Sequence, residues 1–255
     1  MHTVIAQAPD TRAQPEPYAV SAEFYDILQA HDDDRRVRQL YGTAVATARL
    51  GVVDVGAGTG RVTLLSLARS RTGVHAVEPA RAMRAALMTR LAALPAPQRA
   101  RVSVHPYTLG EAALRDVADL VICHNTVASL TPDARRTLWA SVAEALVPGG
   151  RFLFELPPAR LPAEEHRRVF PVRRMGRHEY GGHMVMSAAG PRIRTRVDYW
   201  VRGTHGLLGE HTETFWMWPA TRSDLIADLR RHGFAVSSAR HDPAVLAVTL
   251  GRGPL

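Results

Sequence analysis

The sequence contains no lysine, only one cysteine and no long apolar run. All 32 basic residues are therefore arginine, and against 24 acidic residues they give a formal net charge of +8. A single cysteine excludes a disulfide within the chain, and the apolar stretch around Cys123 predicts a buried side chain rather than a nucleophile. No apolar run approaches the roughly 20 residues of a membrane-spanning helix, and the N-terminus carries Asp10, Arg12 and Glu16 without an apolar signal core. We therefore expect a cytoplasmic protein with no membrane partner.

The high arginine content raises the question of nucleic-acid binding. A clustered arginine surface binds phosphates or carboxylates through bidentate contacts. Here the arginines are spread over many segments without interleaved aromatic residues, which is typical of a solvated surface. We expect no nucleic-acid partner, and the arginine-rich residues 160–177 are a candidate contact for an acidic substrate such as a precursor peptide.

A glycine-rich loop follows the first apolar strand. The run Asp54-Val55-Gly56-Ala57-Gly58-Thr59-Gly60 comes directly after Gly51-Val52-Val53 and leads into a helical pattern. Glycines at alternate positions let backbone N–H groups and the helix N-terminus approach a ligand closely. A dinucleotide fingerprint would need its third glycine at position 61, which is Arg61, so a nicotinamide cofactor is the less favoured interpretation.

A second signal for a nucleoside ligand is Glu78, which ends the apolar residues 74–77. At the end of the second strand of a doubly wound sheet, a carboxylate can accept hydrogen bonds from both hydroxyls of a ribose. The acid alone does not choose between a dinucleotide and another nucleoside.

Strands and helices alternate from residue 52 to 155 and again after residue 218, a pattern that predicts an α/β fold with parallel strands and crossover helices. Residues 156–218 do not alternate in this way. Residues 192–202 and 210–218 read as two strands joined by a turn, which predicts antiparallel pairing. We expect four segments: a tail and helical lid (1–48), a cofactor-binding core (49–155), a substrate cap (156–218) and the completion of the core (219–255).

Taken together, the glycine loop, Glu78-Pro79, the strand at 118–123 and the Pro148-Gly149-Gly150 turn before residues 151–155 resemble class I S-adenosylmethionine-dependent methyltransferases. The resemblance implies S-adenosylmethionine as the cofactor and a Rossmann-like, doubly wound sheet of seven strands, the last antiparallel. It also implies an N-terminal helical lid and an inserted antiparallel β cap, as in small-molecule N-methyltransferases. The cofactor-binding candidates are Tyr25, Asp54, Gly56, Ala57, Gly58, Gly60, Glu78, Pro79, Met83, Tyr107, Thr108, His124 and Asn125.

One part of the family pattern is missing. The family often places an aspartate after the third strand for the adenine amino group, whereas this chain reads His-Pro-Tyr-Thr-Leu at 105–109. Tyr107 and Thr108 are the candidates from that stretch. For Tyr25, an equal alternative is that it anchors the lid helix to the core, because aromatic side chains dominate burial.

Three residues are candidates for catalysis: His124, Glu155 and His211. In an open α/β sheet the ligand lies beyond the carboxyl ends of the strands, where His124 and Glu155 fall. His124 could accept the proton of an amine substrate, or it could only pack the cofactor, since alignment alone carries many methyl transfers. Glu155 could pair with a cationic substrate or with an arginine. His211 lies on the cap face that it shares with Glu213, Phe215 and Met217.

The cap aromatics could surround a substrate ammonium or form ordinary core, and the histidines at 178–183 fit no metal-ligand spacing, so we expect no metal. The expected function is methyl transfer to an amine nitrogen of a small specialised metabolite or a modified peptide, acidic or neutral. The alternatives are an oxygen or carbon acceptor, or a methyltransferase fold with another role. The sequence leaves open whether the chain forms a homodimer.

Overall fold

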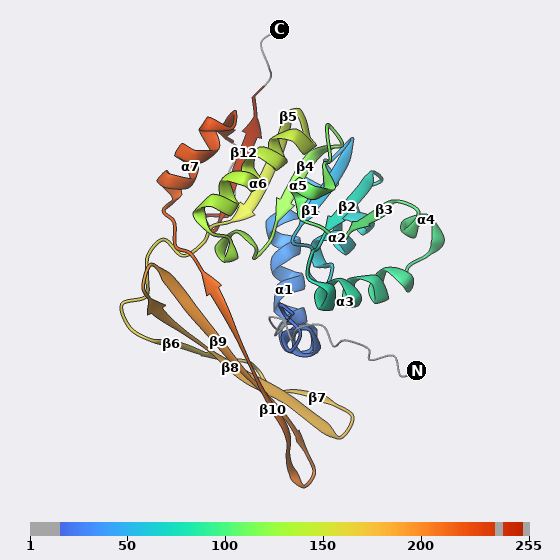
Figure 1. Cartoon of the computed structure of the whole chain (residues 1–255). Coiled ribbons are helices and arrows are strands. Elements are labelled where there is room, and N and C mark those ends of the chain that lie inside the picture. Colours follow the sequence, from blue (N-terminus) through green and yellow to red (C-terminus); the bar gives the residue numbers. More distant parts are fainter. Residues whose placement is uncertain (1–15, 238–241, 252–255) are drawn as a thin grey trace, which may run out of the picture.

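The computed structural model describes residues 16–237 and 242–251. They form an α/β layer and a long antiparallel sheet that projects from one end of it (Figure 1). Most of the predicted N-terminal tail, residues 1–15, lies outside the described residues. In the described part of the chain, no helix has both the length and the apolar composition needed to cross a membrane.

The α/β layer is built on a seven-stranded sheet in the order β11-β12-β5-β4-β1-β2-β3. Strands β1 to β5 are parallel, and β12 runs antiparallel to β5. All five residues of β1 are buried, as expected for a central strand covered on both faces. The predicted α/β class, with seven strands and an antiparallel last strand, is confirmed. The bounds are β1 Gly51–Val55, β2 Gly73–Val77, β3 Val102–His105, β4 Ala118–Cys123, β5 Leu146–Glu155, β11 Phe234–Val236 and β12 Val245–Leu250.

Helices cover both faces of this sheet. On one face Tyr41 and Val45 of α1 pack against Val52 and Leu120; on the other, Trp139 of α6 packs against Phe152 and Phe154 of β5. The first face carries α1 Ser21–Ala46, α2 Arg61–Arg69 and α3 Arg81–Ala92; the second carries α5 Leu109–Ala112, α6 Pro132–Ala145 and α7 Arg222–Arg231. A short helix α4, Ala96–Arg99, precedes β3, and the 3-10 turn η1, Val127–Ser129, follows β4.

Helix α6 begins at a capping signal in the local sequence. Thr131 is its N-cap and accepts a hydrogen bond from the backbone N–H of Ala134, and Pro132 occupies the first turn. The following strand differs from the prediction, because β5 starts at Leu146 rather than at 151. Leu146 already pairs with Ala118, and the pairing becomes irregular before Arg151 pairs with Leu120. The proline and glycines at 148–150 thus interrupt a strand instead of preceding one.

The second sheet has five strands, with β10-β9-β8-β6 in order and β7 paired to β8. The predicted antiparallel pair is present as β9 and β10, but only Thr204 and His205 separate the two strands, so the predicted turn at 203–209 was too long. The long strand β8 was missed because Gly181 and Gly182 weaken its strand signal. The bounds are β6 His166–Val169, β7 Arg173–Met175, β8 His178–Ala189, β9 Arg192–Gly203 and β10 Gly206–Met217. We call this sheet the cap; the segment boundaries at 156 and 218 stay predictions.

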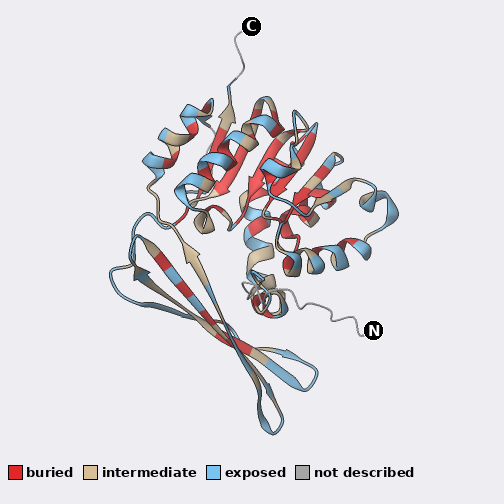
Figure 2. Ribbon diagram, in the orientation of Figure 1, coloured by how far each residue is buried: buried red, intermediate tan, exposed pale blue. Residues whose placement is uncertain are grey.

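Helix α1 connects the two sheets. Near its N-terminus Phe24 stacks on Tyr199 of β9 with ring centroids 4.5 Å apart, and Leu28 joins the same buried cluster. Near its C-terminus Tyr41 and Val45 pack on the seven-stranded sheet. One helix therefore holds the cap against the core and borders the space between them (Figures 1 and 2).

Candidate active site

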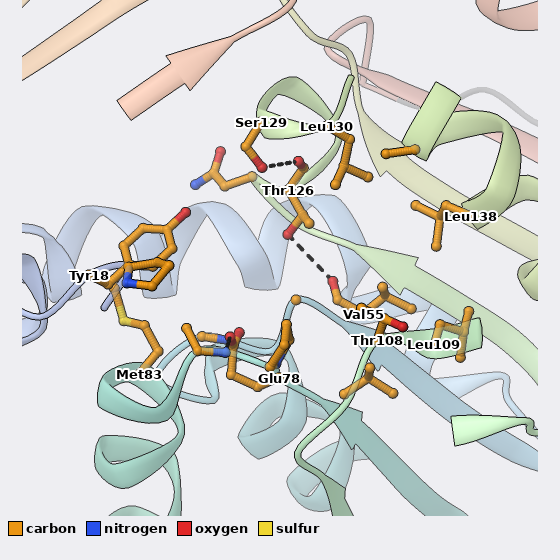
Figure 3. Close-up of a pocket in the computed structure, with 18 of the residues that line it drawn as sticks. Tyr18, Val55, Glu78, Met83, Thr108, Leu109, Thr126, Ser129, Leu130 and Leu138 are labelled. Carbon is orange, nitrogen blue, oxygen red and sulfur yellow. Dashed lines mark hydrogen bonds between the residues drawn. The ribbon is translucent and has the colours of Figure 1, made fainter. Parts of the chain in front are cut away.

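A cavity of about 600 Å³ lies at the carboxyl ends of β1, β2 and β4. The strand order reverses between β1 and β4, and such a switch point is where open α/β sheets bind ligands. Tyr18 and Met83 lie on one side of the cavity and Leu130 and Leu138 on the other, with Glu78 between them (Figure 3). The volume is in the range of small-molecule and cofactor sites.

The glycine loop after β1 forms a bare backbone wall of this cavity. Gly58 has φ +57°, lines the cavity, and a Cβ at this position would approach no protein atom closer than 3.9 Å. Gly56 has φ +68°, and a Cβ there would lie 2.2 Å from the Thr126 hydroxyl. Gly56 is thus required by packing, whereas a side chain at Gly58 would enter the cavity. The cradle at Gly58 fits a ligand that approaches the backbone.

Glu78 lines the cavity and is hydrogen-bonded to the glycine loop. Its carboxylate accepts hydrogen bonds from the backbone N–H of Gly58 at 2.7 Å and of Ala80 at 2.8 Å. Burial raises the pKa of Glu78, while these two N–H groups and Arg84 oppose the rise. Glu78 borders the cavity, where a carboxylate can accept ligand hydroxyls.

Most of the predicted cofactor residues gather around this space. The 600 Å³ cavity is lined by Tyr25, Gly56, Gly58, Glu78, Pro79, Met83, Thr108, His124 and Asn125. Asp54 and Ala57 line a small recess of about 30 Å³ that Tyr25, Gly58 and His124 also border. Asp54 accepts a hydrogen bond from Thr63 Oγ1 at 2.6 Å, and burial raises its pKa to about 6.

Two predicted cofactor residues, Gly60 and Tyr107, line neither the cavity nor the recess. Gly60 has φ +97° and is the N-cap of α2, so its role is to turn the chain into the helix. Tyr107 is 54% exposed and does not line this cavity. The next residue, Thr108, does line it, and it forms a capping box with Glu111 at the start of α5. Tyr107 thus lies outside this cavity, and its assignment as a cofactor contact stays a prediction.

His124 and Glu155 form a buried pair at the ends of β4 and β5. The imidazole Nδ1 lies 2.7 Å from Glu155 Oε2, and Nε2 lies 3.9 Å from Asp33 of α1. Burial alone lowers the pKa of His124, but the neighbouring carboxylates of Asp33 and Glu155 outweigh burial and raise the pKa to about 9. A pKa raised in this way favours the protonated ring at neutral pH.

These contacts bear on the predicted roles of both residues, which stay predictions. A protonated His124 has no lone pair with which to accept a proton from an amine. Glu155 accepts hydrogen bonds from Arg36 at 2.6 and 2.8 Å on one oxygen, and from the Asn125 N–H at 3.2 Å on the other. Burial raises the pKa of Glu155, but His124 and Arg36 outweigh burial and lower it. Of the two predicted alternatives, Glu155 pairs with an arginine.

His211, the third catalytic candidate, is exposed on β10 and lines neither the 600 Å³ cavity nor the second cavity described below. Its ring lies 5.7 Å from that of Phe24. Two other residues of the same predicted face of β10 do point toward the segment at the start of α1. Glu213 accepts a hydrogen bond from the Ser21 N–H at 2.7 Å, and the Phe215 ring stacks on the Tyr18 ring with centroids 4.9 Å apart. His211 lies too far along the strand to reach the cavities.

A second cavity of about 260 Å³ lies between α1, the cap and the end of β5. It shares a wall with the first cavity, formed by Tyr18, Tyr25, Asn125, Thr126 and Ser129. Its remaining surface is mostly apolar and aromatic, with Phe170, Met184, Val197, Tyr199 and Phe215. Thr195 also lines it; this residue is 5% exposed, and its buried hydroxyl has no hydrogen-bond partner. An unpaired buried hydroxyl at a cavity wall is suited to a polar ligand group.

Sequence reasoning missed two features of the site. Arg61 is buried and contacts Asp26 at 2.9 Å, Asp33 at 3.3 Å and Asp34 at 3.0 Å, which anchors α1 over the glycine loop. The acidic run at 32–34 and the arginine at position 61 were visible in the sequence, but not their pairing. The second feature is Tyr18, which has φ +64° and borders both cavities. No sequence motif marked this residue as part of the site.

No cluster for a metal is seen: among the described residues, no three His, Cys, Asp or Glu side chains are arranged to hold an ion. Cys123 is fully buried, as predicted, and burial raises its pKa to about 12, so it stays a thiol.

The glycine loop and the sheet around it match a known family model. Residues 53–152 match the model described as a methyltransferase domain. No curated protein sequence matches the chain.

Solved structures share the fold over nearly the whole chain. An amino pentose methyltransferase from Micromonospora echinaspora, CalS10, solved with S-adenosylmethionine, is 21% identical with a TM-score of 0.65, covering 98% of this chain and 99% of that one. The sugar N-methyltransferase KedS8 from a Streptoalloteichus species is 19% identical with a TM-score of 0.66, covering 99% and 100%. The glycopeptide N-methyltransferase MtfA, solved with S-adenosylmethionine, is 24% identical with a TM-score of 0.56, covering 86% and 87%. The chain has the fold of S-adenosylmethionine-dependent methyltransferases.

Proposed function

We propose that the protein is an S-adenosylmethionine-dependent methyltransferase that methylates an amine nitrogen of a small specialised metabolite or a peptide. The observation that carries this proposal is the pair of cavities with a common wall, one against the glycine loop and one against the cap. The match of residues 53–152 to a methyltransferase domain supports the reaction class. The sugar and glycopeptide N-methyltransferases among the structural neighbours support nitrogen as the acceptor atom.

In this proposal the larger cavity holds the cofactor. Glu78 accepts the ribose hydroxyls, the backbone at Gly58 permits close approach, and Tyr25 and Asp54 border the recess at the methionine end. S-adenosylmethionine supplies an electrophilic methyl group on a sulfonium. The residues of this chain orient the two reactants and exclude water, which is the main requirement of an in-line transfer.

The smaller cavity receives the acceptor. The Thr195 hydroxyl offers a hydrogen bond to a polar group of the substrate. Arg168 borders the cavity and has no carboxylate partner among the described residues, so an acidic substituent would find a cation there. The one carboxylate in the lining, that of Glu155, is already engaged by Arg36 and His124. The site thus offers no free anion for an ammonium group.

This charge distribution favours a neutral amine. Among the described residues that line the smaller cavity, the only carboxylate is that of Glu155, and Arg36 and His124 offset its charge, so the cavity does not favour an ammonium ion over the neutral amine. A neutral amine has the lone pair that forms the new N–C bond, and it releases its proton to solvent afterwards. The protein then needs no general base of its own.

Calorimetric titration with S-adenosylmethionine and S-adenosylhomocysteine, with NADH as a control, tests the cofactor assignment. Binding of the first two alone supports it and leads to a mass-spectrometric screen of amino sugars and peptides for the addition of one methyl group. Binding of NADH alone, or of none of the three, would overturn it. Methylation of hydroxyl or carbon analogues in preference to amines would retain the reaction class and reject nitrogen.

A further inference from the structure

The outer face of the cap carries a row of arginines that no helix covers in the described part of the chain. In β9 the side chains that face α1, those of Ile193, Thr195, Val197 and Tyr199, are buried, at 2–5% exposure. The alternate positions carry polar and charged residues, and the strand changes between buried and exposed along its length (Figure 2). Those outward positions hold Arg192, Arg194, Arg196, Asp198, Trp200 and Arg202.

Neighbouring strands add two arginines to the same face. Arg167 of β6 is opposite Val185, which is opposite Arg196, and Arg174 of β7 is opposite Glu179, which is opposite Arg202. Residues directly opposite each other in a sheet place their side chains on the same face. We call this surface the arginine face; its arginines are Arg167, Arg174, Arg192, Arg194, Arg196 and Arg202.

The charges of this face are largely unneutralised within the chain. Only Arg196 pairs with a carboxylate, that of Asp198 at 2.9 Å. Arg167 and Arg194 are exposed and have no hydrogen-bond or ion-pair partner among the described residues. The arginines along β9 repeat every second residue, so their spacing is roughly 6.6–6.8 Å. The face therefore presents two guanidinium groups without a partner among the described residues, those of Arg167 and Arg194, beside the paired Arg196 and the stacked Arg192.

Two tryptophans lie within the arginine face, contrary to the expectation that no aromatics are interleaved. The Arg202 guanidinium lies 4.3 Å from the centre of the Trp200 ring, and that of Arg192 lies 3.7 Å from the Trp216 ring. Trp200 extends across Gly181, where a Cβ would come within 2.2 Å of the ring. These contacts leave each ring with a guanidinium stacked on it.

We propose that the arginine face docks an acidic protein partner, whose carboxylates pair with Arg167, Arg194 and their neighbours. Guanidinium groups bind carboxylates in bidentate geometry, and an extended acidic segment with a carboxylate on every second residue has the same repeat as β9. A guanidinium stacks on each of the two tryptophan rings, which leaves less ring surface on which nucleic-acid bases could stack. The observations thus favour an acidic protein over a nucleic acid.

The test uses a fluorescently labelled peptide of alternating glutamate and threonine, with a glutamine-threonine peptide as the uncharged control. Binding to the full chain is measured by fluorescence anisotropy at increasing salt. The variant is Arg167→Ser with Arg194→Ser. The matched control is Arg69→Ser with Arg71→Ser, which removes the same charge from exposed positions on the core. All four arginines lack partners in the described structure, so both variants should fold.

The proposal expects salt-sensitive binding of the glutamate peptide by the wild type and the core variant. Loss of two carboxylate contacts should weaken binding by the arginine-face variant about tenfold. Equal binding by both variants would overturn the proposal, because net charge alone would then explain the binding. Absence of binding by the wild type at low salt would also overturn it. Tighter, face-dependent binding of a single-stranded oligonucleotide would overturn it in favour of a nucleic acid. Cofactor titration of both variants keeps this result separate from the methyltransferase proposal.

Discussion

The Nδ1 atom of His124 lies 2.7 Å from the carboxylate of Glu155, and the same carboxylate accepts two hydrogen bonds from Arg36. These contacts favour the cationic form of the histidine, which lies between the larger cavity and α1. Its pKa is higher in the folded state than in the unfolded state, which makes the pair visible in the pH dependence of stability.

We predict that this pair loses stabilising free energy as the pH rises from about 6.5 to about 9. The unfolded histidine releases its proton near pH 6.5, whereas the folded one keeps it to about 9, so the folded state binds more protons in this window. The contribution is fully present below pH 6.5 and amounts to on the order of 3 kcal/mol at most. Urea unfolding from pH 6 to 9 measures the slope. His124→Gln should flatten it, and His166→Gln, at an exposed position, should leave it unchanged.

Gly58→Ala should abolish or strongly weaken cofactor binding while the fold is retained. A methyl group at this position enters the cavity and meets no protein atom within 3.9 Å. Gly176→Ala is the matched control, because Gly176 has φ +59° in the turn between β7 and β8 and also has open space around it. Both substitutions impose a left-handed backbone strain of about 1–2 kcal/mol. If S-adenosylmethionine binds the two variants equally in calorimetry, the cavity is not its site.

Glu78→Gln should weaken S-adenosylmethionine binding about 10- to 100-fold. The substitution keeps the shape of the side chain but removes the charge that strengthens hydrogen bonds from ligand hydroxyls, worth about 1.5–3 kcal/mol. Calorimetry of the variant gives the affinity, and thermal unfolding checks the loop that Glu78 holds at Gly58 and Ala80. Glu144→Gln, an exposed change on α6, serves as the control. Unchanged affinity in Glu78→Gln would reject the ribose assignment.

Thr195→Val should raise the KM for the acceptor and leave the Kd for S-adenosylmethionine unchanged. The hydroxyl has no partner in the protein, so its removal should be neutral or stabilising for the fold. Ser66→Ala removes another unpartnered buried hydroxyl, on α2 and away from both cavities, and should change neither constant. Steady-state kinetics with the identified amine measures the effect. An unaltered acceptor KM in Thr195→Val would exclude this hydroxyl from substrate binding.

The fold of the core could be predicted from the sequence because its signals are local. The apolar run before Gly56, the acid at Glu78 and the Thr131-Pro132 start of α6 each mark an element boundary within a few residues. Strand β5 and the cap were harder to predict. Where these strands begin and end depends on the neighbouring strand with which they pair, as Leu146 of β5 pairs with Ala118 of β4. The local sequence does not reveal which strand that neighbour is.

The chemistry of the site was less predictable than its location. The sequence indicated that His124 and Glu155 lie at the ends of strands, but not that they contact each other and Arg36. A pKa depends on such neighbours, so the proton-acceptor hypothesis could be assessed only once α1 was placed. Tyr18 likewise acquires its position from a stack with Phe215, almost two hundred residues later in the chain.

The turn before α1 belongs to both cavities through Tyr18, and it is fastened to the cap by the Tyr18–Phe215 stack and the hydrogen bond from Ser21 to Glu213. A segment that walls two chambers cannot withdraw from one without uncovering the other. If the proposed function holds and this turn moves during release, the cofactor product and the methylated product would leave in one coupled step.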